Sequence, residues 1–348
     1  MRSIRVVFTF LTILALSSCS SSTPTSSTPT SPGNPVTPAA ATLVYIPYVS
    51  AVVSGGVVTS ASSSIVAFPA NSSGAVSPAS TLTSQNTTDQ YSSVATDSSG
   101  NIYVGSTNLT STVGKISVFA AGSTGAANPI ATITGSATGM ATAYILAVDS
   151  SQNVYVAGTG TVLEFAANAN GNVAPIRTLT GLPACKALAV DPAGNIVYAV
   201  ATGAANADSI EIFTPTQSGN AAPARTISTA SNLLHIAGMG LDTAGNIYVA
   251  NEQYPVSTPV DESILEFPGG VPAGSGTGIG GIEGVPGLAG LYLTALEVDA
   301  AGNIYVLASD GIGNGYLSKW FAGSKGMSSP VQETSHMFAQ TNGPMAVH

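Results

Sequence analysis

The chain has 348 residues, of which only 7% are charged, and its formal net charge is −9. With 17 acidic residues against 8 basic ones it lacks the clustered Lys and Arg that a nucleic-acid partner requires, so we predict no nucleic-acid binding. Beyond residue 16 no stretch approaches the roughly 18 consecutive apolar residues that a spanning helix needs, since Gly and Pro interrupt the chain too often.

The first residues have the layout of an export signal. Arg2 and Arg5 are followed by an apolar segment over residues 6–16 and then by small residues. Positive charge, an apolar core and small residues before a cleavage point are the features of a signal peptide, which is removed before the chain folds. We therefore predict a signal peptide over residues 1–18.

The end of this segment, Leu16-Ser17-Ser18-Cys19, resembles the lipobox of bacterial lipoproteins. The resemblance implies that Cys19 becomes the lipid-bearing first residue and that the membrane is a partner through this lipid. Ser20 at the next position implies the outer membrane where a cell has two membranes. The alternative is an ordinary signal peptide cut near the same place, with Cys19 incidental. We expect a lipid-anchored protein of the cell envelope, at the outer membrane or another extracytoplasmic face.

Residues 19–40 are rich in Ser, Thr and Pro and have no apolar periodicity. Such a segment cannot bury enough apolar surface to fold, so it stays extended. We predict a disordered linker that holds the following domain away from the bilayer.

A repeat begins near residue 41. Its clearest unit is an apolar-Ala-Val-Asp strand, a short turn and a Gly-Asn-Ile-Tyr-Val strand, at intervals of 42 to 57 residues. Intervals near this length are typical of four-stranded propeller blades. In the turn we expect Asp to accept backbone N–H groups and Gly to supply a positive φ. The Asp residues are Asp97, Asp149, Asp191, Asp242 and Asp299.

A second half follows each unit, with a strand that ends in Phe, a Gly/Asn/Ala-rich connection and usually a Pro before another strand. Each Phe is predicted to fill the space between neighbouring sheets, and Pro suits an outermost strand with no partner for its missing N–H. The fifth unit instead has a Gly-rich stretch over residues 269–290. The predicted core phenylalanines are Phe68, Phe119, Phe165, Phe213, Phe267 and Phe321.

The chain contains six second halves but five complete first halves. The missing half is divided between the two ends: residues 343–348 match the apolar-Ala-Val-Asp strand with His348 in the Asp position, and residues 43–46 match the Ile-Tyr-Val strand. Joining them leaves no free edge in a closed ring. We predict an all-β fold, a six-bladed β-propeller over residues 41–348, closed by its N- and C-terminal strands.

The recurring motif A-V-D-x-x-G-N-I-Y-V resembles bacterial NHL-repeat propellers over the whole of residues 41–348. The chain departs from such repeats after the Ile-Tyr-Val strand, where they often continue with Ala-Asp. The resemblance implies the architecture and leaves the ligand undefined.

Propellers commonly bind ligands where the loops before the innermost strands converge. Five to seven residues before each turn Asp the chain has Tyr91, Tyr144, Lys186, His235 and Tyr292. A ring of aromatic and basic side chains would suit a planar, sugar-like or weakly anionic ligand. The alternative is that these side chains only fill the rim of a narrow channel.

The sequence supports a metal site less strongly than a ligand-binding rim. The longest loop, residues 251–263, carries Glu252, Asp261 and Glu262, but their spacing matches no known calcium loop. Glu297 is the remaining acid in an innermost-strand position, and the chain has 3 His residues in total. We predict no cofactor and assign no metal or catalytic residue; Ca²⁺ stays as the alternative.

Two functions remain open. The first is a non-enzymatic, monomeric binding or interaction scaffold with a protein or glycan ligand. The second is a lactonase-like hydrolase or lyase with an axial metal. Cys185, alone if Cys19 carries lipid, is interpreted as a small buried side chain, with a reactive thiol as the alternative.

Overall fold

The computed structural model describes residues 42–54, 57–108, 113–141, 145–200, 202, 208–228, 233, 235–252, 262–270, 280–283, 291–310, 314–335 and 344–348, all within the compact unit Ala41–His348. The predicted signal peptide, the predicted lipid site Cys19, the predicted linker and Tyr144 lie outside the described residues.

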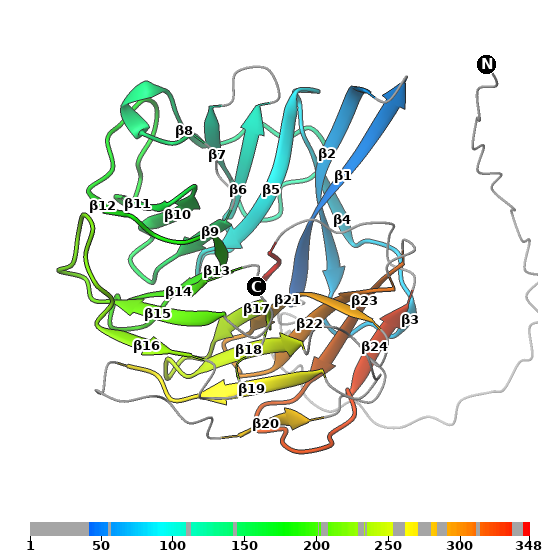
Figure 1. The fold of residues 1–348 in the computed structure, drawn as a ribbon. Coiled ribbons are helices and arrows are strands. Elements are labelled where there is room, and N and C mark those ends of the chain that lie inside the picture. The colour runs from blue at the N-terminus through cyan, green and yellow to red at the C-terminus, as the bar shows by residue number, and fades with distance from the viewer. Residues whose placement is uncertain are drawn as a thin grey trace, which may run out of the picture. The chain divides into compact units, whose positions relative to one another are not determined.

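The described residues form six β-sheets arranged as a ring, with the C-terminus near its centre (Figure 1). Apart from one 3-10 turn at Ser136–Thr138, every regular element in the described residues is a strand. Five sheets have four strands and one has five. This confirms the predicted all-β, six-bladed β-propeller. We number the blades in chain order and give their strands from the centre outwards.

The first three blades follow one plan, in which neighbouring strands are antiparallel. Blade 1 contains β25 (Ala346–Val347), β1 (Leu43–Ser54), β2 (Val57–Pro69) and β4 (Ser80–Thr83). Blade 2 contains β5 (Asp89–Thr96), β6 (Ile102–Asn108), β7 (Gly114–Phe119) and β8 (Ala131–Thr134). Blade 3 contains β9 (Ile145–Val148), β10 (Val154–Gly158), β11 (Thr161–Phe165) and β12 (Arg177–Thr180).

The other three blades repeat this plan. Blade 4 contains β13 (Cys185–Val190), β14 (Ile196–Val200), β15 (Ser209–Phe213) and β16 (Arg225–Ile227). Blade 5 contains β17 (His235–Leu241), β18 (Ile247–Glu252), β19 (Ser263–Phe267) and β20 (Gly280–Glu283). Blade 6 contains β21 (Tyr292–Val298), β22 (Ile304–Ser309), β23 (Gly315–Trp320) and β24 (Gln332–Ser335), with the short β3 (Gly74–Ala75) added in parallel at its outer edge.

The two chain ends share blade 1, as predicted. β25 is its innermost strand and pairs with β1, so that Tyr45 is opposite Ala346 and Val44 is opposite Val347. In the other five blades the innermost strand pairs with the strand that follows it in the chain. The ring is therefore closed by pairing residues near position 44 with residues near position 347.

The Asp-x-x-Gly-Asn turns join the innermost strand of a blade to the second strand. Asp97 accepts hydrogen bonds from the backbone nitrogens of Ser99 (2.9 Å) and Asn101 (3.0 Å), from Asn101 Nδ2 (2.8 Å) and from Tyr103 Oη (3.2 Å). The other four Asp residues accept the equivalent two backbone bonds and the Asn side chain. These contacts confirm that the recurrent Asp residues organise turns.

The turn glycine has a positive φ where it is present, for example +79° at Gly100. In blade 3 the same position is Gln152, whose φ is +66°. Residues with a side chain rarely adopt this region, so the blade 3 turn holds a strained residue where the other turns use glycine.

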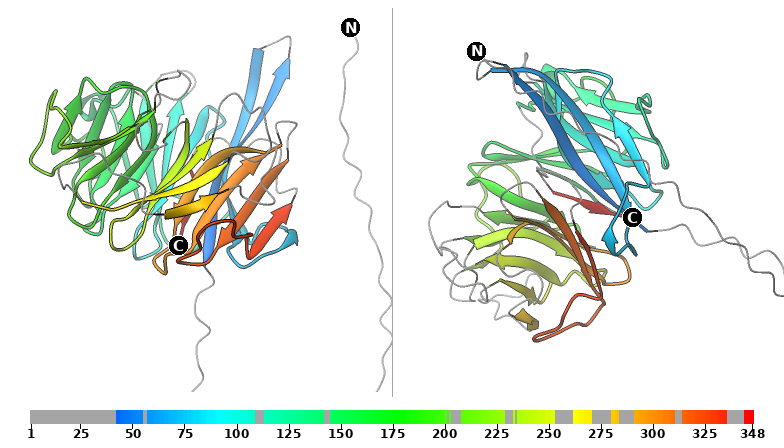
Figure 2. Two further views of the ribbon diagram at one scale, coloured as in Figure 1. Left: turned by 60° about the horizontal axis from the view of Figure 1, so that its bottom comes forward. Right: turned by 90° about the vertical axis from the view of Figure 1, so that its right-hand side faces the viewer.

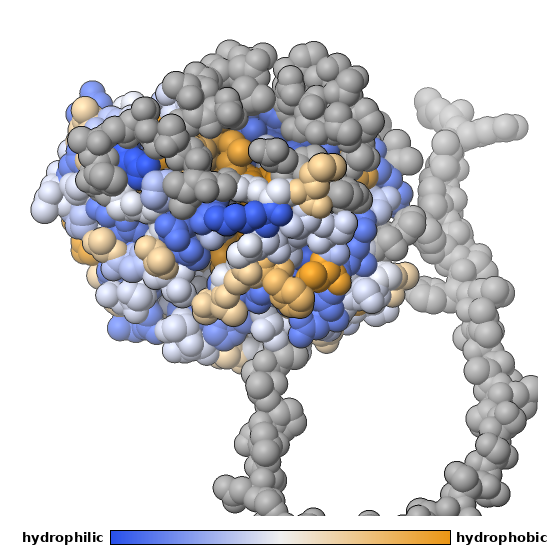
Figure 3. Space-filling model, turned by 90° about the horizontal axis from the view of Figure 1, so that it is seen from below, coloured by the Kyte–Doolittle hydropathy of each residue, from blue (hydrophilic) through white to orange (hydrophobic). Residues whose placement is uncertain are grey.

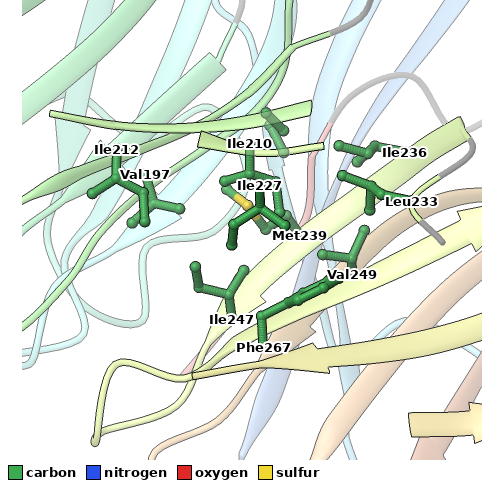
Figure 4. Close-up of a cluster of buried hydrophobic side chains, with 12 residues drawn as sticks. Val197, Ile210, Ile212, Ile227, Leu233, Ile236, Met239, Ile247, Val249 and Phe267 are labelled. Carbon is green, nitrogen blue, oxygen red and sulfur yellow. The ribbon is translucent and has the colours of Figure 1, made fainter. Parts of the chain in front are cut away.

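The predicted plug between sheets is correct for five blades and wrong for blade 6. Phe68, Phe119, Phe165, Phe213 and Phe267 are buried; Figure 4 shows Phe267 against Ile247 and Val249 in the core between blades 4 and 5. Phe321, however, is 58% exposed. Trp320 is fully buried in its place and pairs with Ile304, as Phe119 pairs with Ile102. The strand of blade 6 therefore presents its plug one residue earlier than predicted.

Loops of neighbouring blades cover the outer edges of the sheets. Gly125 of blade 2 exchanges backbone hydrogen bonds with Thr81 and Thr83 on β4 of blade 1, both 2.7 Å. Gly171, Gly219 and Gly326 form the equivalent parallel bridges on β8, β12 and β20, and β3 does so on β24. At β16 the Arg225 guanidinium donates to the carbonyl oxygens of Pro268 (2.8 Å) and Gly270 (3.0 Å). These bridges occupy strand edges that would otherwise invite association.

Two further features shape the ring. β1 and β2 are longer than the strands of other blades and their hairpin extends beyond the ring (Figure 2). Between blades 5 and 6 the innermost strands come close, because a Cβ on Gly238 would collide with the backbone of Leu296 and Ala295. Glycine at this position therefore permits the approach of β17 to β21.

Candidate functional site

The innermost strands define two faces of the ring. Each strand begins at what we call the entry face, where residues such as Asp89, His235 and Tyr292 start β5, β17 and β21. Each ends at the turn face, which carries the Asp-x-x-Gly-Asn turns. The entry face is the one for which the sequence predicted a ligand-binding rim.

A cavity of about 350 Å³ runs along the axis and is lined by residues of all six innermost strands. Its wall consists mainly of main chain and small or aliphatic side chains, among them Ala95, Ala147 and Ala189. The ionisable lining residues among those described are Lys186 on β13 and Glu297 on β21. A cavity of this size, lined by main-chain polar groups, small or aliphatic side chains and two ionisable side chains, falls within the range of small-molecule sites.

Glu297 is the acidic member of the cavity wall. It lies two residues before Asp299, and the residues two before the other turn positions are Ala95, Ala147, Ala189, Gly240 and Ala346. Its side chain is half-buried. Burial among the strands raises the pKa of the Glu297 carboxyl to about 8, and a hydrogen bond with the backbone of Val298 opposes part of this rise. At neutral pH the carboxyl is therefore mostly protonated.

The four described members of the predicted rim lie in different surroundings. Tyr91 is only 4% exposed and packs in the core between blades 1 and 2 with Val94 and Tyr45. Tyr292 is 52% exposed at the start of β21, and Lys186 lines the cavity. The register shift between Tyr91 and Ser93 accompanies the inward placement of Tyr91. Tyr144 falls outside the described residues.

His235, the fourth described member, pairs with an acid on the same blade. Its Nδ1 lies 3.2 Å from Glu252 Oε2 across β17 and β18. The hydrogen bond with Glu252 raises the pKa of His235, against the effects of burial and of the nearby Lys186 charge. Glu252 also accepts the backbone N–H of Leu293 in blade 6. This acid, considered above as a loop ligand for calcium, instead joins blades 5 and 6.

Asp208 makes a similar connection between blades 4 and 5. Its Oδ2 accepts the backbone N–H of Ile236 at 2.9 Å, and its Oδ1 accepts that of Thr202 at 3.0 Å. Asp208 is buried. Both acids therefore fix the starts of innermost strands, a role that sequence spacing did not indicate.

A second polar cluster at the entry face was also missed. Asp89 is buried at the start of β5 and forms an ion pair with Lys115 of β7. It accepts hydrogen bonds from the side-chain amides of Asn108 (2.9 Å) and Asn86 (3.3 Å). These contacts satisfy the carboxylate within blade 2. The signal that could have indicated this cluster is the pairing of the ends of β5 and β6, which places Asp89 opposite Asn108.

Among the described residues, no three His, Cys, Asp or Glu side chains gather as metal ligands would. Cys185 is half-buried at the start of β13. Burial raises the pKa of its thiol to about 12, against hydrogen bonds with Tyr198 and the Ala187 backbone that lower it. This agrees with the interpretation of Cys185 as an unreactive side chain.

The outer side of the ring shows no large apolar surface in the view of Figure 3, where apolar residues form small, separate patches among hydrophilic ones. Within the described residues, the structure has no helix with the length and apolar character to span a membrane. The large hydrophobic residues that are exposed are Ile130, Ile176, Tyr292, Phe321, Met327 and Val331.

Comparisons with known proteins show similarity in fold alone. No family model and no curated protein matches the chain. A solved structure of a protein from Lactobacillus plantarum is 12% identical, covers 88% of this chain and 99% of its own, and has a TM-score of 0.53. A glucose dehydrogenase (11% identical, 80% and 97% covered, TM-score 0.46) and YCF48 bound to D1 peptide (9%, 80% and 78%, TM-score 0.45) are more distant. The chain is thus a six-bladed β-propeller whose fold is similar to that of the Lactobacillus plantarum protein, and its kinship with NHL repeats stays a prediction.

Proposed function

We propose that the chain is a monomeric binding propeller of the cell envelope, held by lipid on Cys19 and spaced from the membrane by residues 19–40. Its ligand enters at the mouth of the axial cavity on the entry face. The order of signal segment, lipobox-like Cys19 and Ser/Thr/Pro segment supports the anchoring. The six-bladed ring supports the binding role, because this fold commonly presents a central site.

The observation that carries the binding proposal is the cavity itself. It opens through the centre of a closed ring and is lined by all six innermost strands. Lys186 and the exposed Tyr292 and His235 lie on the strands that form its mouth. A cavity lined by main chain, small or aliphatic side chains and a few polar side chains suits a small ligand or the end of a glycan or peptide.

The binding proposal is tested with the folded propeller on arrays of envelope glycans and peptides. We expect Tyr292→Ala and Lys186→Ala to reduce retention while leaving the thermal midpoint unchanged. Val331→Ala, a matched control at an exposed apolar position on the outer edge, should retain full binding. Tyr144→Ala is expected to behave like Tyr292→Ala. Equal retention by the rim variants and the control would contradict a site at the mouth.

Anchoring is tested by growing cells with an alkyne-bearing palmitate. The full-length chain should incorporate the label and sediment with membranes, and Cys19→Ser should lose both properties. Cys185→Ser provides the control for labelling at the other cysteine. Label retained by Cys19→Ser would show that Cys19 is not the lipid site.

The position of Glu297 in the wall of the cavity favours the enzymatic alternative. Burial raises the pKa of this carboxyl to about 8, and carboxyl groups with a raised pKa serve as general acids or bases. If the chain is a lactonase-like hydrolase or lyase with an axial metal, added Ca²⁺ should raise both lactone turnover and the melting temperature. A chelator should reverse both effects. Identical melting curves and no turnover with Ca²⁺ would reject this alternative.

A further inference from the structure

One acidic side chain breaks the six-fold pattern of the channel wall. Five repeats have Ala or Gly two residues before the turn position, as at Ala95 and Gly240, whereas β21 has Glu297. An Ala would complete the wall as it does in blade 2. Because the five other blades show that the fold does not require an acid here, Glu297 calls for an explanation other than folding.

The carboxyl of Glu297 has no basic partner among the described ion pairs, which join Lys115 to Asp89, Arg177 to Glu164, His235 to Glu252 and Lys325 to Glu266. The surrounding wall includes Leu296, Met345 and Val347, which cannot neutralise a charge. A carboxylate that burial removes from water and that has no counter-ion is unfavourable, and a ligand of opposite charge would stabilise it.

The ionisable groups on neighbouring strands are already engaged elsewhere. Tyr305, opposite Glu297 on β22, donates its hydroxyl to Asp299 at 3.0 Å. His235 and Glu252, on the strands of blade 5, pair with each other at the entry face. The described groups therefore leave the positive partner of Glu297 to be supplied from outside the protein.

Lys186 is the other ionisable residue in the wall, and it lies toward the opposite end. It is near the start of β13, five residues before Asp191, whereas Glu297 is two residues before Asp299. Three residues of strand correspond to about 10 Å along the axis. A stretch of wall made of main chain and small or aliphatic side chains therefore separates Lys186, toward the entry face, from Glu297, toward the turn face.

We propose that the axial cavity binds a small linear aliphatic amine, with its ammonium group paired to Glu297 and its hydrocarbon stem along the aliphatic wall. This site rests on the proposed binding function and adds to it the chemical class of the ligand, which reaches Glu297 at the turn-face end of the cavity. The net charge of −9 favours cations in the surroundings of the protein. When the ammonium arrives, the Glu297 carboxyl releases its proton to solvent and becomes the carboxylate of the ion pair.

The test uses the folded propeller at pH 7 with hexylamine, and with hexanol as a neutral molecule of similar size. Titration calorimetry in two buffers of different ionisation enthalpy measures affinity and proton release together. We expect hexylamine to bind with release of a proton, and hexanol to bind at least about tenfold more weakly, as expected for loss of a charge-assisted contact. Glu297→Gln, nearly equal in shape, should lose this preference and the proton release.

Glu297→Ala provides a second variant, since Ala is the residue at this position in four other blades, and the fold should be retained. It should also lose hexylamine binding. The ¹³C signal of the Glu297 carboxyl should move toward its ionised value on hexylamine addition. Equal hexylamine affinity in Glu297→Gln, or a carboxyl signal that does not move at saturating amine, would overturn the proposal. If the protein retains ligands on the arrays but does not bind hexylamine, the amine site is rejected and the proposed binding function stands.

Discussion

Leu43 and His348, 305 positions apart in the chain, exchange two backbone hydrogen bonds: Leu43 N–H donates to His348 (2.7 Å) and His348 N–H donates to Leu43 (3.0 Å). This pair continues the ladder between β1 and β25, where Val44 is opposite Val347. It is the link that closes the ring within blade 1. The His348 imidazole also packs near blade 2, since a Cβ on Gly100 would lie 2.8 Å from its Nε2.

Removal of residues 343–348 should therefore destabilise the whole propeller. The deletion removes the innermost strand of blade 1, exposes the edge of β1 and uncovers the core contacts of Met345 and Ala346, which are buried. We expect the free energy of unfolding to fall by about 3 kcal/mol or more, with aggregation through the open edge. Thermal and urea denaturation measure the change. His348→Ala keeps the backbone pairing and should change stability little; unchanged stability in the deletion would refute closure by the termini.

Trp320 and Phe321 offer a test of the corrected plug in blade 6. Trp320→Ala should cost about 3–5 kcal/mol because it empties a fully buried position, whereas Phe321→Ala should cost less than about 1 kcal/mol because Phe321 is 58% exposed. Trp320→Phe, which restores the residue of the other five blades, should lie between them. It would leave some space and remove the hydrogen bond of Trp320 Nε1 to the Ser328 carbonyl, 3.0 Å. Similar losses for both alanine variants, measured by urea denaturation, would contradict the assignment.

The architecture was predictable because each blade repeats the same chemistry. The Asp-x-x-Gly-Asn turn needs a carboxylate and a residue that tolerates positive φ, and the motif recurs wherever these are needed. The place of the plug in blade 6 was harder to predict, because Trp320 and Phe321 are adjacent and both large and aromatic. Strand alternation decides which one faces the core, and it is set by pairing with Ile304 rather than by composition.

The site was less predictable for a related reason. The number of residues between a side chain and the turn Asp does not determine whether that side chain faces solvent. At Tyr91 the pairing of β5 with β6 is irregular, and the aromatic side chain is buried rather than exposed. The roles of Glu252 and Asp208 depend on backbone N–H groups of the next blade, which no local pattern reveals. Glu297 was visible in the sequence as an acid among Ala residues, but only the shape of the cavity shows what surrounds it.

The turn of blade 3 should be improvable by one substitution. Gln152 has φ +66°, where the corresponding turn residues are Gly, so Gln152→Gly should raise the free energy of unfolding by up to about 1 kcal/mol. The loss of its contact from Nε2 to Asp97 (3.3 Å) offsets part of the gain. Asp149→Ala in the same turn should instead cost about 2 kcal/mol, because it removes the acceptor for the backbone N–H groups of Ser151 and Asn153, for Asn153 Nδ2 and for the Tyr155 hydroxyl. Urea midpoints of the two variants should move in opposite directions.

Cys185 should react slowly with thiol reagents in the folded protein. Burial raises the pKa of its thiol to about 12, so the reactive thiolate is scarce at pH 8. We expect labelling by a chromogenic disulfide reagent to be at least about a hundredfold slower than in urea-unfolded protein, on a chain that starts at residue 41. The unfolded chain serves as the control for complete reaction. Rapid labelling of the native protein would restore the reactive-thiol alternative.

Glu297 should make the propeller less stable as the pH rises. Its pKa is raised to about 8 in the folded protein from 4.5 when unperturbed, so the folded state holds a proton that the unfolded state has released. The contribution to stability is full below pH 4.5, declines between pH 4.5 and 8, and is lost above. Relative to Glu297→Gln, which cannot ionise, the native chain should lose on the order of 3 kcal/mol across this range, since each pKa unit corresponds to about 1.4 kcal/mol and the water of the cavity reduces the effect. Urea denaturation of both proteins at pH 4.5, 6, 7 and 8.5 measures the difference, which cancels the titration of all other groups. A difference that stays constant across these pH values would show that the carboxyl titrates in the folded protein as it does in the unfolded chain, and that the cavity does not raise its pKa.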